Sequence, residues 1–298
     1  MSRYARQEIL PEVGTAGQAR LGAARVLVVG AGGLGASALP LLAGAGVGAL
    51  RLVDPDRIEE SNLHRQVLYR MADLGAPKAE IAARELLRLN PGVAVEARVA
   101  RLDPGSAPGL VEGVGLVLDL ADSFAVTYTL SDLCAARGLP MVSASAQGWR
   151  GYAGGFCGGG PSYRALFPEP PERAESCAGG GVMGPAVAAL GATAAQIALS
   201  ILLGRGGLAQ LVTMDFARWR MGGFRFEGAE EPATPLRFIA AAEIGAGDCV
   251  IDLRAAAPGA PVPGRRAVFV CSSGLRAWRA AAAHVAAGGR AAMLAAGE

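Results

Sequence analysis

The sequence predicts a doubly wound, mostly parallel α/β sheet with helices on both faces. Apolar runs at 26–30 and 50–54 end in Gly or Asp, and a helix-length segment separates them, which is the pattern of a β-α-β unit. Two further apolar runs, at 115–119 and 140–143, flank a helix-like segment at 125–137. Strands that alternate with helices in this way are typical of a parallel sheet.

The remaining segments extend this pattern. A charged, Ala/Leu-rich helix at 78–90 leads to a strand at 93–99, and Gly-rich segments after 147 indicate antiparallel strands. The uncharged segment 182–203 is long enough to span a bilayer, but it contains Gly, Pro and polar residues, and Ala dominates it. We therefore expect a buried helix that begins near Pro185, and no membrane partner.

Composition limits the possible classes of protein. The 298 residues are 52% hydrophobic and 18% charged, which excludes disorder, and the formal net charge of +2 indicates no nucleic-acid partner. The five cysteines form no C-x-x-C pair, so neither a disulfide framework nor a paired zinc site is expected, and a cytoplasmic location fits best. The polar run 227–235 has the composition of a linker and divides the chain into domains at 1–230 and 236–298.

A glycine motif follows the first predicted strand. Gly30, Gly32 and Gly35 form G-x-G-x-x-G, which lets a phosphate approach a helix N-terminus closely. Asp54 ends the next strand, where a carboxylate can accept hydrogen bonds from ribose hydroxyls. Taken alone, these residues favour an NAD-dependent oxidoreductase.

A second set of motifs changes that interpretation. It comprises Asp56, the run SNLHRQ at 61–66, GAPK at 75–78, DLAD at 119–122 and RYARQ at 3–7. Over residues 1–225 these motifs resemble the ThiF/MoeB branch of the ubiquitin-activating enzyme superfamily. The resemblance implies a Rossmann-like homodimer that uses ATP and Mg²⁺ to adenylate the C-terminal carboxylate of a ubiquitin-like sulfur-carrier protein.

The resemblance also implies roles for individual residues. Asp54 would hold the ribose, Asp122 would hold Mg²⁺, and Arg6 would reach into the neighbouring subunit's site. The remaining nucleotide contacts would come from Gly30, Gly32, Gly33, Gly35, Asp56, Asn62, Arg65, Gln66 and Lys78. The chemistry needs such residues because a carboxylate that attacks a phosphate brings two anions together, and Arg65 and Lys78 supply compensating cations.

The chain departs from the family at three places. Ser123 and Thr127 stand where the family has Asn and Arg, which puts the rate of turnover in question. The run SYRA at 162–165 replaces the family's Cys-Tyr-Arg-Cys, and a second cysteine pair near 217–225 is absent. No structural zinc is therefore expected.

Two cysteines are candidates for covalent chemistry. Cys177 precedes a glycine run and matches the family's mobile-loop cysteine, either as a covalent acceptor of the carrier or as an inert thiol. Cys271 opens a C-x-x-G-x-R loop after strands at 250–254 and 268–270. This segment resembles a shortened rhodanese sulfurtransferase domain, either one that accepts a persulfide on Cys271 or a packing remnant. The remaining cysteines are expected in the core, namely Cys134, Cys157 and Cys249.

Three functions remain to be compared. The leading hypothesis is adenylation of a carrier that ends in Gly-Gly, after which a persulfide donor provides sulfur for a thiocarboxylate, in a molybdopterin, thiamine or related pathway. A non-catalytic carrier-binding pseudoenzyme is the second, motivated by Ser123 and Thr127. The third, an NAD-dependent oxidoreductase, is disfavoured because hydride transfer has no use for Arg65, Lys78 and Asp122.

Overall fold

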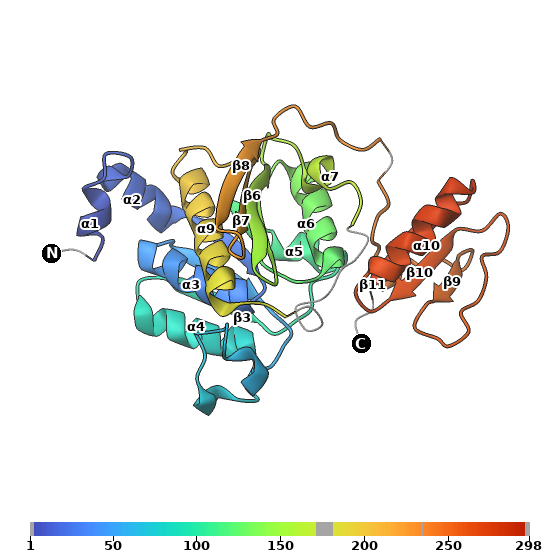
Figure 1. The fold of residues 1–298 in the computed structure, drawn as a ribbon, viewed down its shortest axis with the longest axis horizontal. Helices are drawn as coiled ribbons and strands as arrows, with labels where there is room; N and C mark the ends of the chain where they lie inside the picture. The colour runs from blue at the N-terminus through green and yellow to red at the C-terminus, as the bar shows by residue number, and fades with distance from the viewer. Residues whose placement is uncertain (1–2, 171–180, 234, 296–298) are drawn as a thin grey trace.

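The computed structural model describes residues 3–170, 181–233 and 235–295. The described strands form an eight-stranded sheet and a three-stranded sheet, which build the larger and the smaller body in Figure 1. The larger body contains α1 (Ala5–Glu8), α2 (Gly14–Ala23), β1 (Arg25–Val29), α3 (Gly33–Ala45), β2 (Ala49–Val53), η1 (Glu60–Asn62), η2 (Met71–Asp73), α4 (Lys78–Leu89), β3 (Ala94–Arg98), α5 (Ala107–Leu110), β4 (Leu116–Asp119), α6 (Phe124–Arg137), β5 (Pro140–Gln147), β6 (Arg150–Cys157), α7 (Tyr163–Leu166), α9 (Gly184–Leu202), β7 (Gln210–Asp215) and β8 (Arg220–Arg225).

The large sheet confirms the predicted fold class. Its strand order is β3-β2-β1-β4-β5-β6-β7-β8. The neighbours from β3 to β5 pair in parallel, and those from β5 to β8 pair antiparallel. The strand order reverses between β1 and β4, which is the place where open α/β sheets bind ligands.

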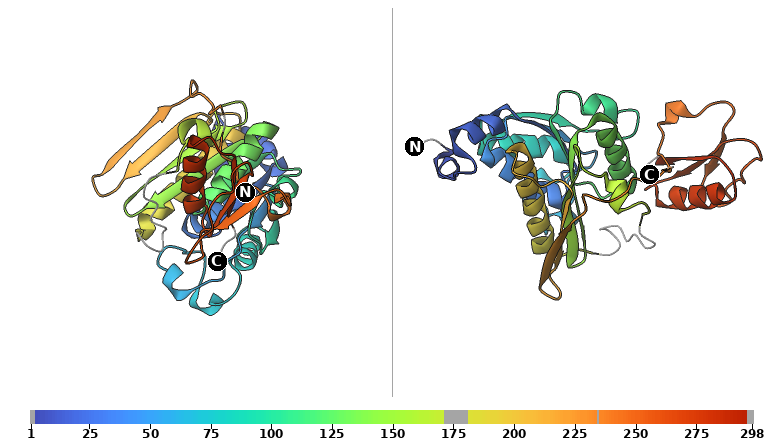
Figure 2. Two further views of the ribbon diagram at one scale, coloured as in Figure 1. Left: turned by 90° about the vertical axis from the view of Figure 1, so that its right-hand side faces the viewer. Right: turned by 90° about the horizontal axis from the view of Figure 1, so that it is seen from above.

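Alternating side chains of the central strands fill the two faces of the sheet. On β1, Val26 and Val28 belong to a core cluster shared with α3, α4 and α9, whereas Leu27 and Val29 belong to a cluster shared with α6. Because both faces are covered, β1 and β4 are apolar along nearly their whole length. Figure 2 shows the helices packed on opposite sides of the sheet.

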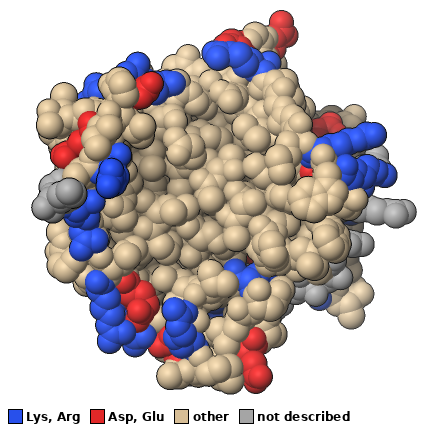
Figure 3. Space-filling model, turned by 60° about the vertical axis from the view of Figure 1, so that its left-hand side comes forward, with Lys and Arg blue, Asp and Glu red and all other residues tan. Residues whose placement is uncertain are grey.

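Helix α9 begins at Gly184, close to the predicted start, and Pro185 occupies its first turn. It is long and apolar enough to cross a membrane by length and composition alone, and 44% of its apolar window is buried. It packs against α3 and against β5 and β6. No residue of α9 carries a charge, and Figure 3 shows a broad face on this side of the molecule with charged residues gathered at its edge.

The smaller body consists of η3 (Ala241–Glu243), β9 (Cys249–Asp252), β10 (Ala267–Cys271), α10 (Leu275–Ala286) and β11 (Ala291–Ala295). Its strands are parallel in the order β11-β10-β9. Phe238 and Cys271 belong to the same buried cluster as residues of α6, and a Cβ at Gly274 would lie 3.2 Å from the Cβ of Ala125. The Cys271 loop therefore packs against the first turn of α6.

The other cysteines are buried to different extents. Cys134 and Cys157 are buried in the core, and burial raises the pKa of the Cys157 thiol to about 12. Cys249 is only partly buried, and it packs against the edge of the same core.

Residues 162–165 replace the first cysteine pair that the family resemblance implies, and they make polar contacts. Ser162 caps α7 by accepting hydrogen bonds from the amides of Arg164 and Ala165. The amide and hydroxyl of Ser162 each donate to Glu231 at 2.6 Å. The buried Arg164 pairs with Asp132. Across the described ranges, no group of three or more His, Cys, Asp or Glu side chains is placed to hold a metal.

Replacement of Ser162 by Ala is expected to destabilise the fold. It removes a helix cap, which typically contributes about 1 kcal/mol, and a hydrogen bond to a charged group, which contributes about 1.5 kcal/mol or more. Urea unfolding should show a loss of about 2 kcal/mol for Ser162→Ala and a change within about 0.5 kcal/mol for the partly exposed control Ser200→Ala. Equal stability of the two variants would contradict this role.

Candidate active site

A cavity of about 570 Å³ opens where the large sheet reverses its strand order. Residues at the carboxyl ends of β1, β2, β4 and β5 line it. Ten of the predicted site residues are among its lining: Gly30, Gly32, Gly33, Asp54, Asp56, Asn62, Arg65, Gln66, Lys78 and Asp122. The structure thus brings together residues that are up to 92 positions apart in the sequence (122 − 30).

The glycines have different parts in this cavity. Gly30 has a φ of +101°, and a Cβ there would lie 2.6 Å from the carbonyl oxygen of Leu120. A Cβ at Gly35 would lie 2.2 Å from the carbonyl oxygen of Gly30, so Gly35 serves the packing of the turn and does not line the cavity. Gly32 is the N-cap of α3. The positive end of this helix therefore faces the cavity, an arrangement that favours a bound phosphate.

Both carboxylate oxygens of Asp54 accept hydrogen bonds from the backbone. Its Oδ2 accepts a hydrogen bond from the amide of Ala31 at 2.7 Å, and its Oδ1 accepts one from the amide of Asp56 at 2.8 Å. Burial raises the pKa of the Asp54 carboxyl, and these two hydrogen bonds oppose that shift. Asp54 therefore holds the glycine turn in place. The Asp56 side chain, in contrast, is 59% exposed.

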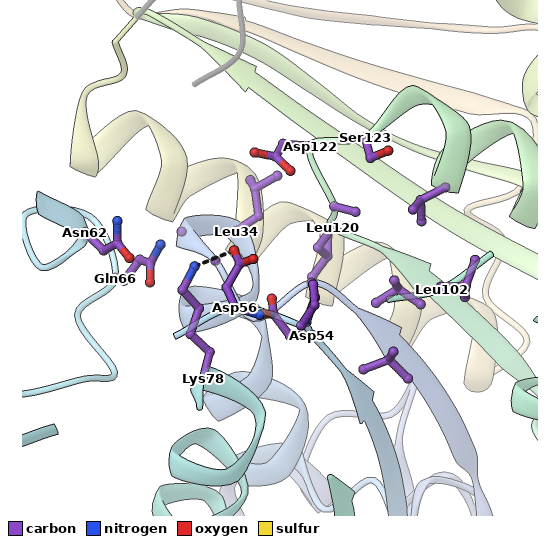
Figure 4. A pocket seen from close by; sticks show the side chains of 18 of the residues that line it. Leu34, Asp54, Asp56, Asn62, Gln66, Lys78, Leu102, Leu120, Asp122 and Ser123 are labelled. Atoms are coloured by element: carbon purple, nitrogen blue, oxygen red, sulfur yellow. Dashed lines mark hydrogen bonds and ion pairs between the residues drawn. The ribbon is translucent and has the colours of Figure 1, made fainter. Parts of the chain in front are cut away.

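Lys78 provides a buried cation at the start of α4. Its side chain is 7% exposed, and its Nζ lies 2.8 Å from Oδ2 of Asp56. Figure 4 shows the two side chains in contact at the cavity. An arriving phosphate would meet an ammonium group that is held in place by a partner still open to water.

The segment around η1 forms another wall. Asn62 stabilises this turn because its Oδ1 accepts from the amide of Glu59 at 3.3 Å. Nη1 of Arg65 donates to the carbonyl of Ser61 at 3.1 Å, and the aliphatic part of the Arg65 side chain lies beside Gly33. Gln66 is buried, and its Oε1 has no hydrogen-bond partner among the residues that the structure describes. This wall therefore retains polar capacity for a ligand.

Asp122 lies in the turn between β4 and α6, on a different wall from Lys78 (Figure 4). Ser123 beside it is the N-cap residue of α6 and also lines the cavity. Thr127 does not line it, because its hydroxyl donates instead to Oδ2 of Asp119 at 2.7 Å. The sequence could not show this difference between the two departures from the family pattern.

Three predicted residues lie elsewhere or outside the described ranges. Arg6 is exposed on α1, which contacts the carboxyl end of α3 through Gln7 and Ala45, whereas the cavity lies at the opposite end of α3. Cys177 falls outside the described residues. Cys271 belongs to the smaller body, where its Sγ accepts hydrogen bonds from the amides of Gly274 at 3.1 Å and Ala277 at 3.3 Å.

Sequence reasoning missed several lining residues, namely Arg57, Glu59, Ala100, Arg101, Leu102 and Ser145. Arg101 and Leu102 come shortly after the carboxyl end of β3, and Ser145 lies near that end of β5. Their position at the ends of predicted parallel strands was the available signal, because all these ends meet at one edge of the sheet.

Several known proteins are similar to this chain. Residues 4–234 match the ThiF family. Adenylyltransferase and sulfurtransferase UBA4 of Yarrowia lipolytica is 44% identical over 205 residues, which are 68% of this chain and 52% of that protein. The uba4 protein of Aspergillus fumigatus is 45% identical over 211 residues, 67% of this chain and 43% of that one. The chain thus spans about half the length of these relatives.

A third relative is covered more fully. The SAMP-activating enzyme E1 of Haloferax volcanii is 44% identical over 208 residues, which are 69% of this chain and 77% of that protein. Among solved structures, E. coli MccB with ATP has a TM-score of 0.67 at 21% identity, over 78% of this chain and 72% of that one, a likeness in fold. The matched family and the close relatives agree, and the chain belongs to the ThiF family.

Proposed function

We propose that this protein adenylates the C-terminal carboxylate of a ubiquitin-like sulfur-carrier protein, with ATP as the second substrate. The observation that carries this proposal is the cavity itself, which joins a helix N-terminus with Lys78 and Arg65 and faces them with Asp122. The names of the relatives, an adenylyltransferase and sulfurtransferase and a SAMP-activating enzyme, support the same reaction.

Each wall has a task in this reaction. Asp56 is the carboxylate that faces the cavity, so it is the better acceptor for the ribose hydroxyls, while Asp54 maintains the glycine turn. The phosphates lie toward the N-terminus of α3, where Lys78 and Arg65 offset their charge. The carrier carboxylate attacks the α-phosphorus, a P–O bond forms, and the bond to pyrophosphate breaks. The products are the carrier acyl-adenylate and pyrophosphate.

Asp122 is the residue that would hold Mg²⁺. The Asp122 carboxylate lines the cavity and suits this ion, because Mg²⁺ in nucleotide sites is bound by one or two carboxylates together with substrate phosphates. When bound, the ion would neutralise charge on the phosphates and the leaving pyrophosphate. The protein's own contribution is the turn between β4 and α6, which places Asp122 at the cavity.

The competing functions are less well supported. Hydride transfer to a nicotinamide gains nothing from the phosphate-facing Lys78 and Arg65 or from Asp122. The pseudoenzyme hypothesis rested on Ser123 and Thr127, but Thr127 points toward Asp119 and away from the cavity. Lys78, Arg65 and Asp122 all line the cavity, which supports turnover.

Exposed apolar side chains on two neighbouring turns support a docking surface for the carrier. Trp149 is exposed in the turn between β5 and β6, just after the cavity-lining Ser145 and Ala146. Trp219 is 80% exposed in the turn between β7 and β8, and Phe216 beside it donates its amide to the carbonyl of Trp149. We place the globular part of the carrier on these turns, with a flexible Gly-Gly tail reaching the cavity.

A homodimer would bring Arg6 to the reaction. Arg6 lies at the far end of α3 from the cavity of its own chain. The uncharged face around α9 has the composition of a surface that a second copy covers (Figure 3). Arg6 of one subunit would then act on the transition state in the other, and Cys271 would accept sulfur from a persulfide donor for the later thiocarboxylate.

Replacement of Asp122 by Ala tests the adenylation itself. Loss of the carboxylate should lower carrier-dependent ATP–pyrophosphate exchange by about 100-fold or more, while thermal unfolding stays unchanged. Glu80→Ala, which removes an exposed carboxylate on α4 outside the cavity, should keep full exchange. Exchange within a few-fold of the unmodified protein in Asp122→Ala would refute the assignment.

The dimer proposal is tested by complementation. Arg6→Ala should lower exchange by about 100-fold without a matching loss of ATP affinity, because the residue acts on the transition state. Mixed with Asp122→Ala subunits, it should regain activity, since each heterodimer contains one site with both residues intact. Two inactive variants that stay inactive after mixing would show that Arg6 does not act across subunits.

The thiol that receives sulfur is tested by peptide mapping. The amides of Gly274 and Ala277 donate to the Sγ of Cys271 at the start of α10, whereas Arg276 donates to the carbonyl of Leu253. After incubation with a persulfide donor, the added sulfur mass should be found on Cys271 and be absent in Cys271→Ser. Sulfur found only on Cys177 would reverse this assignment and leave the smaller body a packing remnant.

A further inference from the structure

A buried polar cluster lies beneath the turn that carries Asp122. At its centre is Asp119, the last residue of β4, which is 1% exposed. Its Oδ2 accepts hydrogen bonds from the hydroxyls of Thr127 at 2.7 Å and Ser143 at 3.0 Å. Its Oδ1 accepts one from the amide of Ala121 at 3.4 Å. All three donors to this carboxylate are neutral groups.

These contacts join every segment that meets at the turn. Ser143 is the register partner of Asp119 on β5, and Thr127 lies in the first turn of α6. The amide of Thr127 donates to the carbonyl of Ser123 at 3.1 Å, and its hydroxyl lies 3.3 Å from the same carbonyl. One carboxylate therefore connects β4, β5 and α6 around residues 120–123, the stretch in which Asp122 lies.

We propose that Asp119 is a positioning residue, and that the hydroxyls of Thr127 and Ser143 hold it so that the turn presents Asp122 to the cavity. The proposal rests on the adenylation function above, because it concerns the placement of Asp122. Thr127 is then the residue through which this chain replaces a family cation by a neutral hydrogen bond.

The surroundings make this cluster sensitive to pH. The titratable groups that interact with Asp119 are Asp122 on the turn, Cys134 of α6, Tyr152 of β6 and Tyr163 of α7. Burial raises the pKa of the Asp119 carboxyl to about 6, and the hydroxyl and amide hydrogen bonds oppose the rise. Below that pH the carboxyl becomes a donor, so it can no longer accept from all three partners.

Stability and activity should therefore respond to pH in opposite directions. The folded pKa of about 6 lies above the ordinary value of 3.8, so protonation of Asp119 favours the folded state. Its contribution to the free energy of unfolding falls as the pH rises from 3.8 to about 6. Activity should rise over the same interval, because only the ionised carboxylate accepts all the hydrogen bonds that hold the turn.

A set of substitutions at Thr127 and Asp119 provides the test. Thr127→Val should lower the kcat of ATP–pyrophosphate exchange about tenfold with little change in the KM for ATP, and Thr127→Ser should restore it to within about threefold. Asp119→Asn should be slow at all pH values and lack the acid limb near pH 6. Thr127→Arg should move that limb to lower pH, since a neighbouring cation favours the ionised carboxylate.

Amide hydrogen exchange gives a readout that does not depend on activity. Corrected for intrinsic rates, exchange at 120–127 should be faster in Thr127→Val than in Thr127→Ser, and faster in the unmodified protein at pH 5 than at pH 7. Equal protection in the two variants, or a Thr127→Val enzyme with unchanged kcat and acid limb, would overturn the proposal. An unmodified protein without any exchange of pyrophosphate would instead refute the adenylation function, and the protection data would still decide the role of Asp119.

Discussion

The two halves of the cavity meet where the turn after β1 touches the turn after β4. At that contact a Cβ on Gly30 would lie 2.6 Å from the carbonyl oxygen of Leu120, so only glycine with its positive φ fits. The first turn opens the N-terminus of α3 for phosphate, and the second carries Asp122. A side chain at residue 30 would push the phosphate site and Asp122 apart, and the rest of the site depends on their separation.

The ion pair between Lys78 and Asp56 is buried on one side and exposed to water on the other. A buried ammonium such as that of Lys78 needs a partner, because an uncompensated charge with little access to water is costly. Asp56 supplies that partner while remaining largely hydrated, so this ion pair is buried on one side only. In the proposed reaction, phosphate oxygens would take the place of Asp56 beside Lys78, and its carboxylate would then be available to ribose hydroxyls.

Much of the architecture was predictable from the sequence because the parallel strands are short apolar runs between helix-length segments. Ten of the residues that the family resemblance singled out line one cavity. Residues 291–295, AAMLA, form β11 although their composition favours a helix, since pairing with β10 decides their conformation. The short helices α1 and α2 lack a strong apolar period and were not predicted.

Roles of individual residues in the cavity were harder to assign, because they depend on which side-chain atoms already make hydrogen bonds within the protein. Asp54 and Asp56 are two residues apart and chemically identical, yet only the first has both oxygens bonded by backbone amides. Thr127 is a second example. In the sequence it stands where the family resemblance implies an Arg, and in the structure its hydroxyl donates to Asp119. Hydrogen-bond partners of this kind lie far apart in the chain, so no local pattern reveals them.

The smaller body depends on contacts with the larger one to bury its apolar side chains. Three parallel strands and one long helix bury little apolar surface on their own. Phe238 and Cys271 are buried in a cluster shared with α6, and a Cβ at Gly274 would meet the Phe238 ring at 2.8 Å and the Cβ of Ala125 at 3.2 Å. The first turn of α6 therefore supports the nucleotide cavity through Ser123 and the Cys271 loop through Ala125. A shift of this turn would change the positions of residues at both sites.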